Sequence, residues 1–207
     1  LALALAPQRP RLVVAARNLE RLETLAEECR ALGAEVMPVE TDVTDAAQCR
    51  RLADNTVATF GRIDTLVANA GVTMWALFEE LENLDLLEKI MRVNYFGSVY
   101  CTHYALPYLK ESRGRIVAVA SLTALNGVPT RSGYAASKHA LHGLFESARP
   151  ELQEREAGEI TDAALAWLRE RRDTETSKPF FLWVHYFDPH QPYSSPLEQL
   201  PEFRGRP

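Results

Sequence analysis

The stretch Ser121–Lys138, S-L-T-A-L-N-G-V-P-T-R-S-G-Y-A-A-S-K, places a hydroxyl, a phenol and an ammonium at spacings that can share one site. If a helix begins at Tyr134, Lys138 lies one turn later on the same face, within reach of the phenol or of a ligand beside it. A free phenol has a pKa of about 10, so it transfers protons poorly at neutral pH unless a nearby cation favours the phenolate. Lys138 is placed to be that cation, and the stretch is typical of a proton-transfer site.

A buried strand is predicted immediately before this stretch. Arg115–Ala120 is apolar after its first residue, as expected of a parallel strand covered on both faces. Ligands bind at the carboxyl ends of such strands, so Ser121 is expected at the mouth of a cleft. Tyr-x-x-x-Lys is also common on exposed helices, but its position after a strand and a Gly/Pro loop favours the catalytic interpretation.

Strands and helices alternate upstream of this stretch. Apolar strands are predicted over Arg11–Ala16, Glu35–Val43 and Ile63–Ala68. The helices between them begin after the capping residues Asn18 and Asp45 and end near Gly33 and Gly61. A further helix is expected from about 84 to 110. This alternation predicts an α/β fold with a doubly wound parallel sheet.

Several motifs, in their order and spacing, resemble the short-chain dehydrogenase/reductase family over residues 1–153. Besides Ser121, Tyr134 and Lys138, the matching motifs are Asp42-Val43, Asn69-Ala70-Gly71 and Val93-Asn94-Tyr95-Phe96-Gly97. The resemblance implies a Rossmann-like fold and an NAD(P)-dependent oxidoreductase that interconverts an alcohol and a carbonyl. It also implies that Tyr134 is the acid/base, and that Asn94 helps to hold a water in a relay toward Lys138.

The same resemblance implies a set of cofactor-binding residues. They are Asp42 and Val43 on the adenine side, Asn69, Ala70 and Gly71 at the glycine turn, and Tyr134 and Lys138 in the active site. Arg17 follows the strand Arg11–Ala16, where an acidic residue would bind a ribose 2′-hydroxyl and a guanidinium suits a 2′-phosphate. NADP is therefore favoured, with NAD as the alternative. A simple solvent-exposed arginine is the competing interpretation of Arg17.

The N-terminal part departs from the family pattern. Leu1–Ala6 is typical of the tail of a helix that ends at Pro7, and the family's T-G-x-x-x-G-x-G loop does not occur in the sequence. Those glycines let backbone amides approach the cofactor pyrophosphate. We therefore expect the sheet to lack its first strand and the glycine-rich loop. This first strand is central in the family's sheet. Its absence is therefore expected to leave the inner edges of Arg11–Ala16 and Ile63–Ala68 unpaired.

Residues from about 156 to 207 resemble a second family, the sulfatases. The resemblance rests on a helix T-D-A-A-L-A-W-L from Thr161, the apolar strand Phe180–Phe187 and a D-P-H-x-P-Y loop. In sulfatases the histidine that matches His190 contacts the sulfate ester. No cysteine begins a C-x-P-S-R nucleophile motif and the metal-binding carboxylates are missing, so sulfatase activity is not expected. The strand is expected to pair in parallel with Arg115–Ala120 through a right-handed crossover.

Composition limits the partners. The net charge of -5 and the absence of a basic stripe argue against nucleic acid. The three cysteines have no metal-ligand spacing, which argues against a metal site and favours a reducing compartment. Leu1–Ala6 is too short to span a membrane. A cytoplasmic protein acting on a small-molecule alcohol or carbonyl is expected, with no membrane partner, and association into a homo-oligomer is left open.

Two functions from different classes compete. The first is the oxidoreductase, with a dehydrogenase-like domain over 1–153 and a sulfatase-like fragment over 154–207. The alternative is a non-catalytic fused remnant of a dehydrogenase and a sulfatase, inactive because both sites are incomplete. Binding of NADP would distinguish the two.

Overall fold

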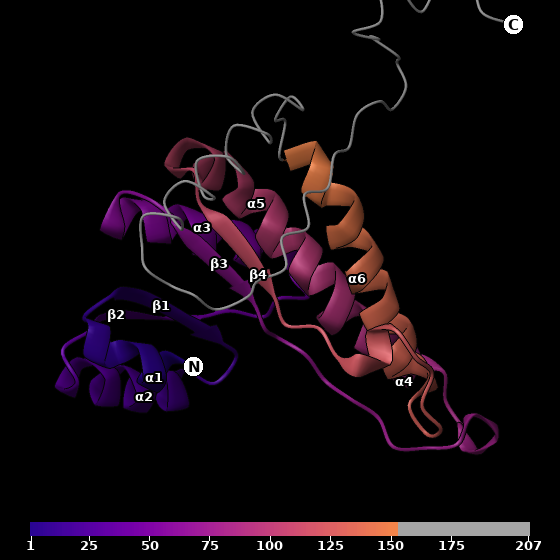
Figure 1. Ribbon diagram of the computed structural model, residues 1–207. Coiled ribbons are helices and arrows are strands. Elements are labelled where there is room, and N and C mark those ends of the chain that lie inside the picture. Colours follow the sequence, from indigo (N-terminus) through magenta and orange to yellow (C-terminus); the bar gives the residue numbers. More distant parts are fainter. Residues whose placement is uncertain (153–207) are drawn as a thin grey trace, which may run out of the picture. The chain divides into compact units, whose positions relative to one another are not determined.

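The computed structural model describes residues 1–152. The chain divides into two units, Leu1–Phe145 and Glu146–Pro207. The described elements are shown in Figure 1 and are, in order, α1 (Ala2–Leu5), η1 (Ala6–Gln8), β1 (Arg11–Ala16), α2 (Leu19–Ala31), β2 (Glu35–Glu40), α3 (Ala46–Phe60), β3 (Thr65–Ala68), η2 (Phe78–Glu80), α4 (Asp85–Met91), η3 (Arg92–Phe96), α5 (Gly97–Ser112), β4 (Arg115–Ala118), η4 (Leu122–Ala124) and α6 (Ser132–Leu152). The predicted α/β alternation is confirmed.

The strands form two parallel pairs. β1 pairs with β2 in a register that matches Arg11 with Glu35, and β3 pairs with β4 in a register that matches Thr65 with Arg115. Within the described residues no strand joins the two pairs, so β1 and β3 each have one strand neighbour. This is the arrangement expected when the central strand of a doubly wound sheet is not among the described elements.

A first core lies between α2 and the pair β1–β2. The side chain of Asn18 caps α2 by accepting a hydrogen bond from Arg21 N at 2.9 Å. The helix then buries Ala26 and Cys29 at helical spacing, together with Val36 of β2. Capping and an apolar stripe therefore explain why α2 forms and which face it turns to the strands.

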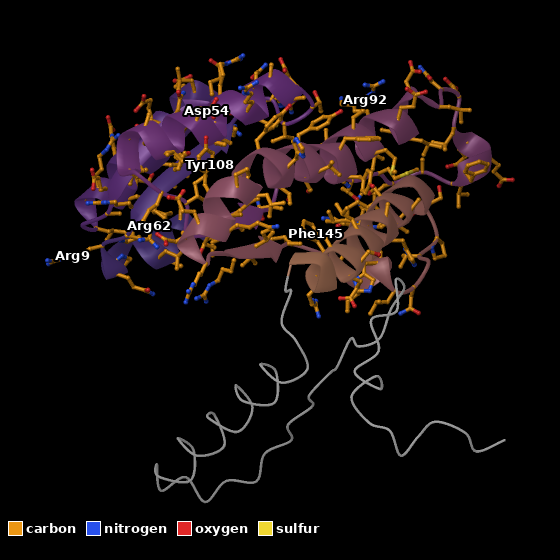
Figure 2. All side chains as sticks on the ribbon, turned by 90° about the horizontal axis from the view of Figure 1, so that it is seen from above. Arg9, Asp54, Arg62, Arg92, Tyr108 and Phe145 are labelled. Carbon is orange, nitrogen blue, oxygen red and sulfur yellow. The ribbon has the colours of Figure 1, made fainter. Side chains whose placement is uncertain are left out.

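A second core lies between α3, α5 and β3. Ala53, Ile63, Ala105 and Leu109 are buried together. At the surface of the same contact the Tyr108 hydroxyl donates to Asp54 Oδ1 at 3.3 Å, and Figure 2 labels both residues. α3 also contacts β1, and α5 contacts β3.

The helix predicted over about 84–110 is present from Asp85 to Ser112, and its middle departs from α-helical geometry. A π-helical turn, η3, separates α4 from α5. Short π-helical segments are rare and are found frequently at functional sites. Gly97 follows the turn, and a Cβ there would stand 2.7 Å from Val43 Cγ2. The close approach of this helix to the segment after β2 therefore requires glycine.

Two predicted strands end earlier than expected, and one lies outside the described residues. β2 ends at Glu40 rather than Val43, and β4 ends at Ala118 rather than Ala120, because the backbone turns there to form the loops that carry polar residues. The predicted strand Phe180–Phe187 and the fragment 154–207 lie outside the described residues, so their pairing stays a prediction.

Candidate active site

Tyr134 and Lys138 lie on one face near the start of α6. The helix begins at Ser132, two residues earlier than predicted. Lys138 Nζ stands 5.9 Å from the centroid of the Tyr134 ring. The lysine is only 4% exposed, and this burial lowers its pKa. A cation is therefore held close to the phenol, as the spacing of the two residues indicated, while their catalytic roles stay predictions.

Ser121 lies at the carboxyl end of β4, where it caps η4. Its Oγ accepts hydrogen bonds from Thr123 N at 3.2 Å and from Thr123 Oγ1 at 2.9 Å. Lys138 Nζ donates to the carbonyl of Val119 at 2.7 Å, so the ammonium lies beside the same strand end. Within the described residues no hydrogen bond joins Ser121 to Tyr134. The direct approach of these two hydroxyls thus stays a prediction.

Asn94 is fully buried in the π-helical turn and connects three segments. Its Oδ1 accepts from Val72 N at 2.8 Å, and its Nδ2 donates to Val72 O and to Ser137 Oγ, both at 2.9 Å. Ser137 Oγ in turn donates to the carbonyl of Tyr134 at 2.7 Å. The amide side chain therefore links the glycine turn after β3 to the helix that carries Tyr134.

Sequence reasoning missed the contribution of Ser137. It stands between Tyr134 and Lys138 in the motif, is 0% exposed, and is the helix residue that Asn94 contacts. The one signal in the sequence was its position three residues after Tyr134, where a serine hydroxyl can reach back to a helix carbonyl.

The glycine turn lies against the same buried groups. A Cβ at Gly71 would stand 3.4 Å from Asn94 Oδ1 and 3.8 Å from Lys138 Nζ. Because glycine has no side chain, the backbone at Gly71 stays accessible next to the ammonium, and a ligand can approach there. Asn69 and Ala70, the other two residues of the predicted cofactor motif, follow β3 directly and are exposed.

Two residues predicted to bind the cofactor, Arg17 and Asp42, line a cavity. Arg17 and Asp42 contribute to a space of about 320 Å³, whose other lining residues are Thr44, Asp85, Glu88, Lys89, Arg92 and Val93. Val43 packs against Gly97 beside this segment. Three cations and three carboxylates thus surround the cavity. Lys89 and Arg92 were not among the predicted residues, because only the fold brings α4 and η3 next to the end of β1.

Asp42 is held by the loop that follows it. Its Oδ1 accepts from Thr44 N at 2.9 Å and from Thr44 Oγ1 at 2.8 Å. These two hydrogen bonds lower the pKa of Asp42, and the nearby Arg17 lowers it further. The carboxylate is therefore ionised and fixed at neutral pH. It contributes a fixed negative charge to the cavity beside Arg17.

The described residues carry groups that would suit the two ends of a dinucleotide. Arg17, Lys89 and Arg92 can face a phosphate-bearing adenosine, and the bare backbone at Gly71 beside the Lys138 ammonium suits a ribose with its base. The sequence contains no glycine-rich loop of the G-x-x-x-G-x-G form for the pyrophosphate between them. Within the described residues no group of three His, Cys, Asp or Glu side chains could hold a metal ion, and no helix there is long and apolar enough to cross a membrane.

Comparison with known families and proteins gives concordant matches. Residues 1–163 match the family described as short chain dehydrogenase. The chain is 45% identical over 142 residues to 11-beta-hydroxysteroid dehydrogenase 1A of Arabidopsis thaliana, which covers 68% of this chain and 41% of that protein. It is 43% identical over 141 residues to 11-beta-hydroxysteroid dehydrogenase A of Sesamum indicum, and the match covers 68% of this chain and 40% of that protein. The chain thus spans less than half the length of these curated relatives.

Solved structures with the same fold include nucleotide complexes. The alcohol dehydrogenase from the archaeon Thermococcus sibiricus, complexed with 5-hydroxy-NADP, matches with a TM-score of 0.70 and 28% identity, over 75% of this chain and 67% of that chain. The NAD+-bound xylitol dehydrogenase matches with a TM-score of 0.70 and 29% identity, over 73% of this chain and 58% of that chain. Their parallel-sheet fold is that of the described residues.

Proposed function

The chain belongs to the short-chain dehydrogenase family, and on this premise we propose that it is an NAD(P)-dependent oxidoreductase that interconverts an alcohol and a carbonyl. The observation that carries the proposal is the buried ammonium of Lys138. It stands 5.9 Å from the Tyr134 ring and is anchored on the carbonyl of Val119 at the carboxyl end of β4. A buried cation beside a phenol is the arrangement that proton transfer by tyrosine needs.

Each described residue then has a definite task in the proposed reaction. A bound nicotinamide cofactor supplies the hydride exchange with the substrate carbon. Tyr134 gives or takes the proton at the substrate oxygen, and the positive charge of Lys138 favours the phenolate form. Ser121, at the same strand end, donates a hydrogen bond to that oxygen. Asn94 fixes the position of Tyr134 through the Ser137 hydroxyl.

We further propose that NADP is preferred over NAD. Arg17 lies at the end of β1, and the cavity that it lines also receives Lys89 and Arg92. Guanidinium groups bind phosphate oxygens in a bidentate manner and can also stack on adenine. Arg92 pairs with Glu88 at 4.0 Å, so Arg17 and Lys89 are the cations that support recognition of a 2′-phosphate.

The test is the loss of activity when the Tyr134 hydroxyl is removed. Tyr134→Phe should lower kcat by about 1,000-fold, the contribution typical of a general acid–base. Reduction of a panel of aliphatic and alicyclic ketones, followed by absorbance of the reduced nicotinamide, measures it. Tyr104→Phe is the matched control, because this tyrosine packs against the second core. Equal losses in both variants would contradict the assignment.

The separation of the two strand pairs favours a second candidate, the non-catalytic fused remnant. Because no described strand joins β1–β2 to β3–β4, the cofactor ends are carried by elements that share no sheet. In this candidate residues 154–207 are a sulfatase-like fragment without its nucleophile. Calorimetry decides between the two functions: binding of NADP by the full chain supports the oxidoreductase, and no heat with either NADP or NAD supports the remnant.

A further inference from the structure

Two loops that leave the carboxyl ends of β3 and β4 are joined to each other. Loop 69–84 follows β3 and loop 121–131 follows β4 (Figure 1). Ala76 N donates to the carbonyl of Thr130 at 3.1 Å, and Arg131 donates to Thr73 Oγ1 at 3.1 Å. The two loops therefore contact each other next to the start of α6.

Arg131 brings a positive charge to this contact. Its guanidinium carbon lies 3.6 Å from the centroid of the Trp75 ring and 5.6 Å from that of Tyr134. Stacking on the exposed indole fixes the plane of the guanidinium through a cation–π interaction. The charge is thus held in a defined place beside the predicted acid/base.

Most of the hydrogen-bonding capacity of Arg131 is unused by the described residues. A guanidinium has five N–H donors, and one contact, to Thr73, is made here. The five salt bridges found among the described residues involve other arginines. The half-buried cation therefore lacks a carboxylate within the part of the chain that the structure describes.

The same loops expose large apolar side chains. Six large hydrophobic residues of the described chain are at least 60% exposed, and five of them lie in these two loops: Trp75, Phe78, Leu84, Leu122 and Leu125. Exposed apolar side chains combined with a few polar groups are typical of a ligand site. Here the polar group is a fixed guanidinium.

We propose that Arg131 binds the anionic group of an amphipathic carbonyl or alcohol substrate, whose apolar body contacts these loops. A neutral apolar ligand would desolvate the cation without pairing it, which is costly. A small anion alone would leave the apolar side chains uncovered. A carboxylate on an apolar body satisfies both, because the guanidinium fork matches a carboxylate. The inference rests on the proposed function, since it places the substrate beside Tyr134.

Binding without turnover tests the proposal. Isothermal calorimetry of the full chain compares decanoate with methyl decanoate, which have the same apolar chain and differ in charge. Decanoate should bind about tenfold more tightly, the size of one charge-assisted hydrogen bond. Arg131→Gln should abolish the preference. Arg131→Lys should retain part of it, because the charge remains while the planar fork is lost. Arg21→Gln, which removes an exposed arginine on α2, should keep it in full.

Two results would overturn the proposal: equal affinities in the unmodified chain, or a preference that survives Arg131→Gln. If Arg131→Gln does not fold, the salt dependence of decanoate binding to the unmodified chain decides, because screening must reduce a preference that arises from charge. The result is independent of catalysis. A chain that binds decanoate but turns over no ketone contradicts the proposed oxidoreductase alone, and an active chain without an anion preference contradicts this inference alone.

Discussion

The two ends of the candidate site differ in how deeply their polar groups are buried. Asn94 and Ser137 are 0% exposed, and the Asn94 amide has hydrogen-bond partners at both its oxygen and its nitrogen. At the adenosine end Arg17 is exposed and Asp42 is half-buried. Breaking a buried bond leaves a polar group without water or partner, whereas an exposed charge is re-solvated. The buried end should therefore control stability and geometry, and the open end should control only which nucleotide binds.

The largest expected effect is at the buried end. Asn94→Ala removes the bonds to Val72 and Ser137 and leaves their polar groups unsatisfied, so the free energy of unfolding should fall by about 3 kcal/mol. Urea unfolding measures it. Asn126→Ala, an exposed asparagine in the loop after β4, is the control and should change it by less than about 0.5 kcal/mol. Similar small changes in the free energy of unfolding of Asn94→Ala and Asn126→Ala would contradict the claim that the buried end controls stability.

An intermediate effect is expected at the open end, and on cofactor choice rather than on stability. Arg17→Ala should erase a preference for NADP over NAD of about tenfold, because it removes one charge-assisted contact to the 2′-phosphate. Calorimetric affinities for both nucleotides measure it, with Arg21→Ala as the control. A preference that persists in Arg17→Ala but disappears in Arg92→Gln would move phosphate recognition from the end of β1 to η3.

The smallest expected effect is on how the free energy of unfolding depends on pH. Because burial lowers the pKa of Lys138, the unfolded chain binds more protons than the folded chain between that lowered pKa and the unfolded value of about 10.4. The unfolding free energy that Lys138 contributes should thus rise with pH across this window. Urea unfolding at pH 7 and pH 10 should show the rise in the unmodified chain and in Lys110→Met, an exposed control. Lys138→Met should lack it, and parallel curves for all three chains would contradict the buried charge.

Much of the local structure could be predicted from short patterns. The bounds of β1, the caps Asn18 and Asp45, and the single turn between Tyr134 and Lys138 all follow from residues within a few positions of each other. Propensity, capping and apolar periodicity act over that range. The helix predicted over 84–110 is present, but the π-helical turn that carries Asn94 was not predicted.

Cofactor and catalytic residues were predicted individually, and their arrangement was not. Nothing in the local pattern around Lys89 or Arg92 indicated that they line the same cavity as Arg17. The sequence pattern also did not predict that Arg131 lies close to the rings of Trp75 and Tyr134. Both depend on how two loops or helices pack against each other. The periodicity of side chains within one element does not encode that placement.

The sequence by itself determined the alternation of strands and helices, the family motifs and the pairing of a phenol with an ammonium on one helix face. Only the tertiary structure decided that Asn94 holds Val72, 22 residues away, and Ser137, 43 residues away. The reason is physical. A local pattern fixes a conformation through neighbouring residues, whereas a buried hydrogen bond between distant residues forms only where the packing of several elements removes water and brings the two partners within reach.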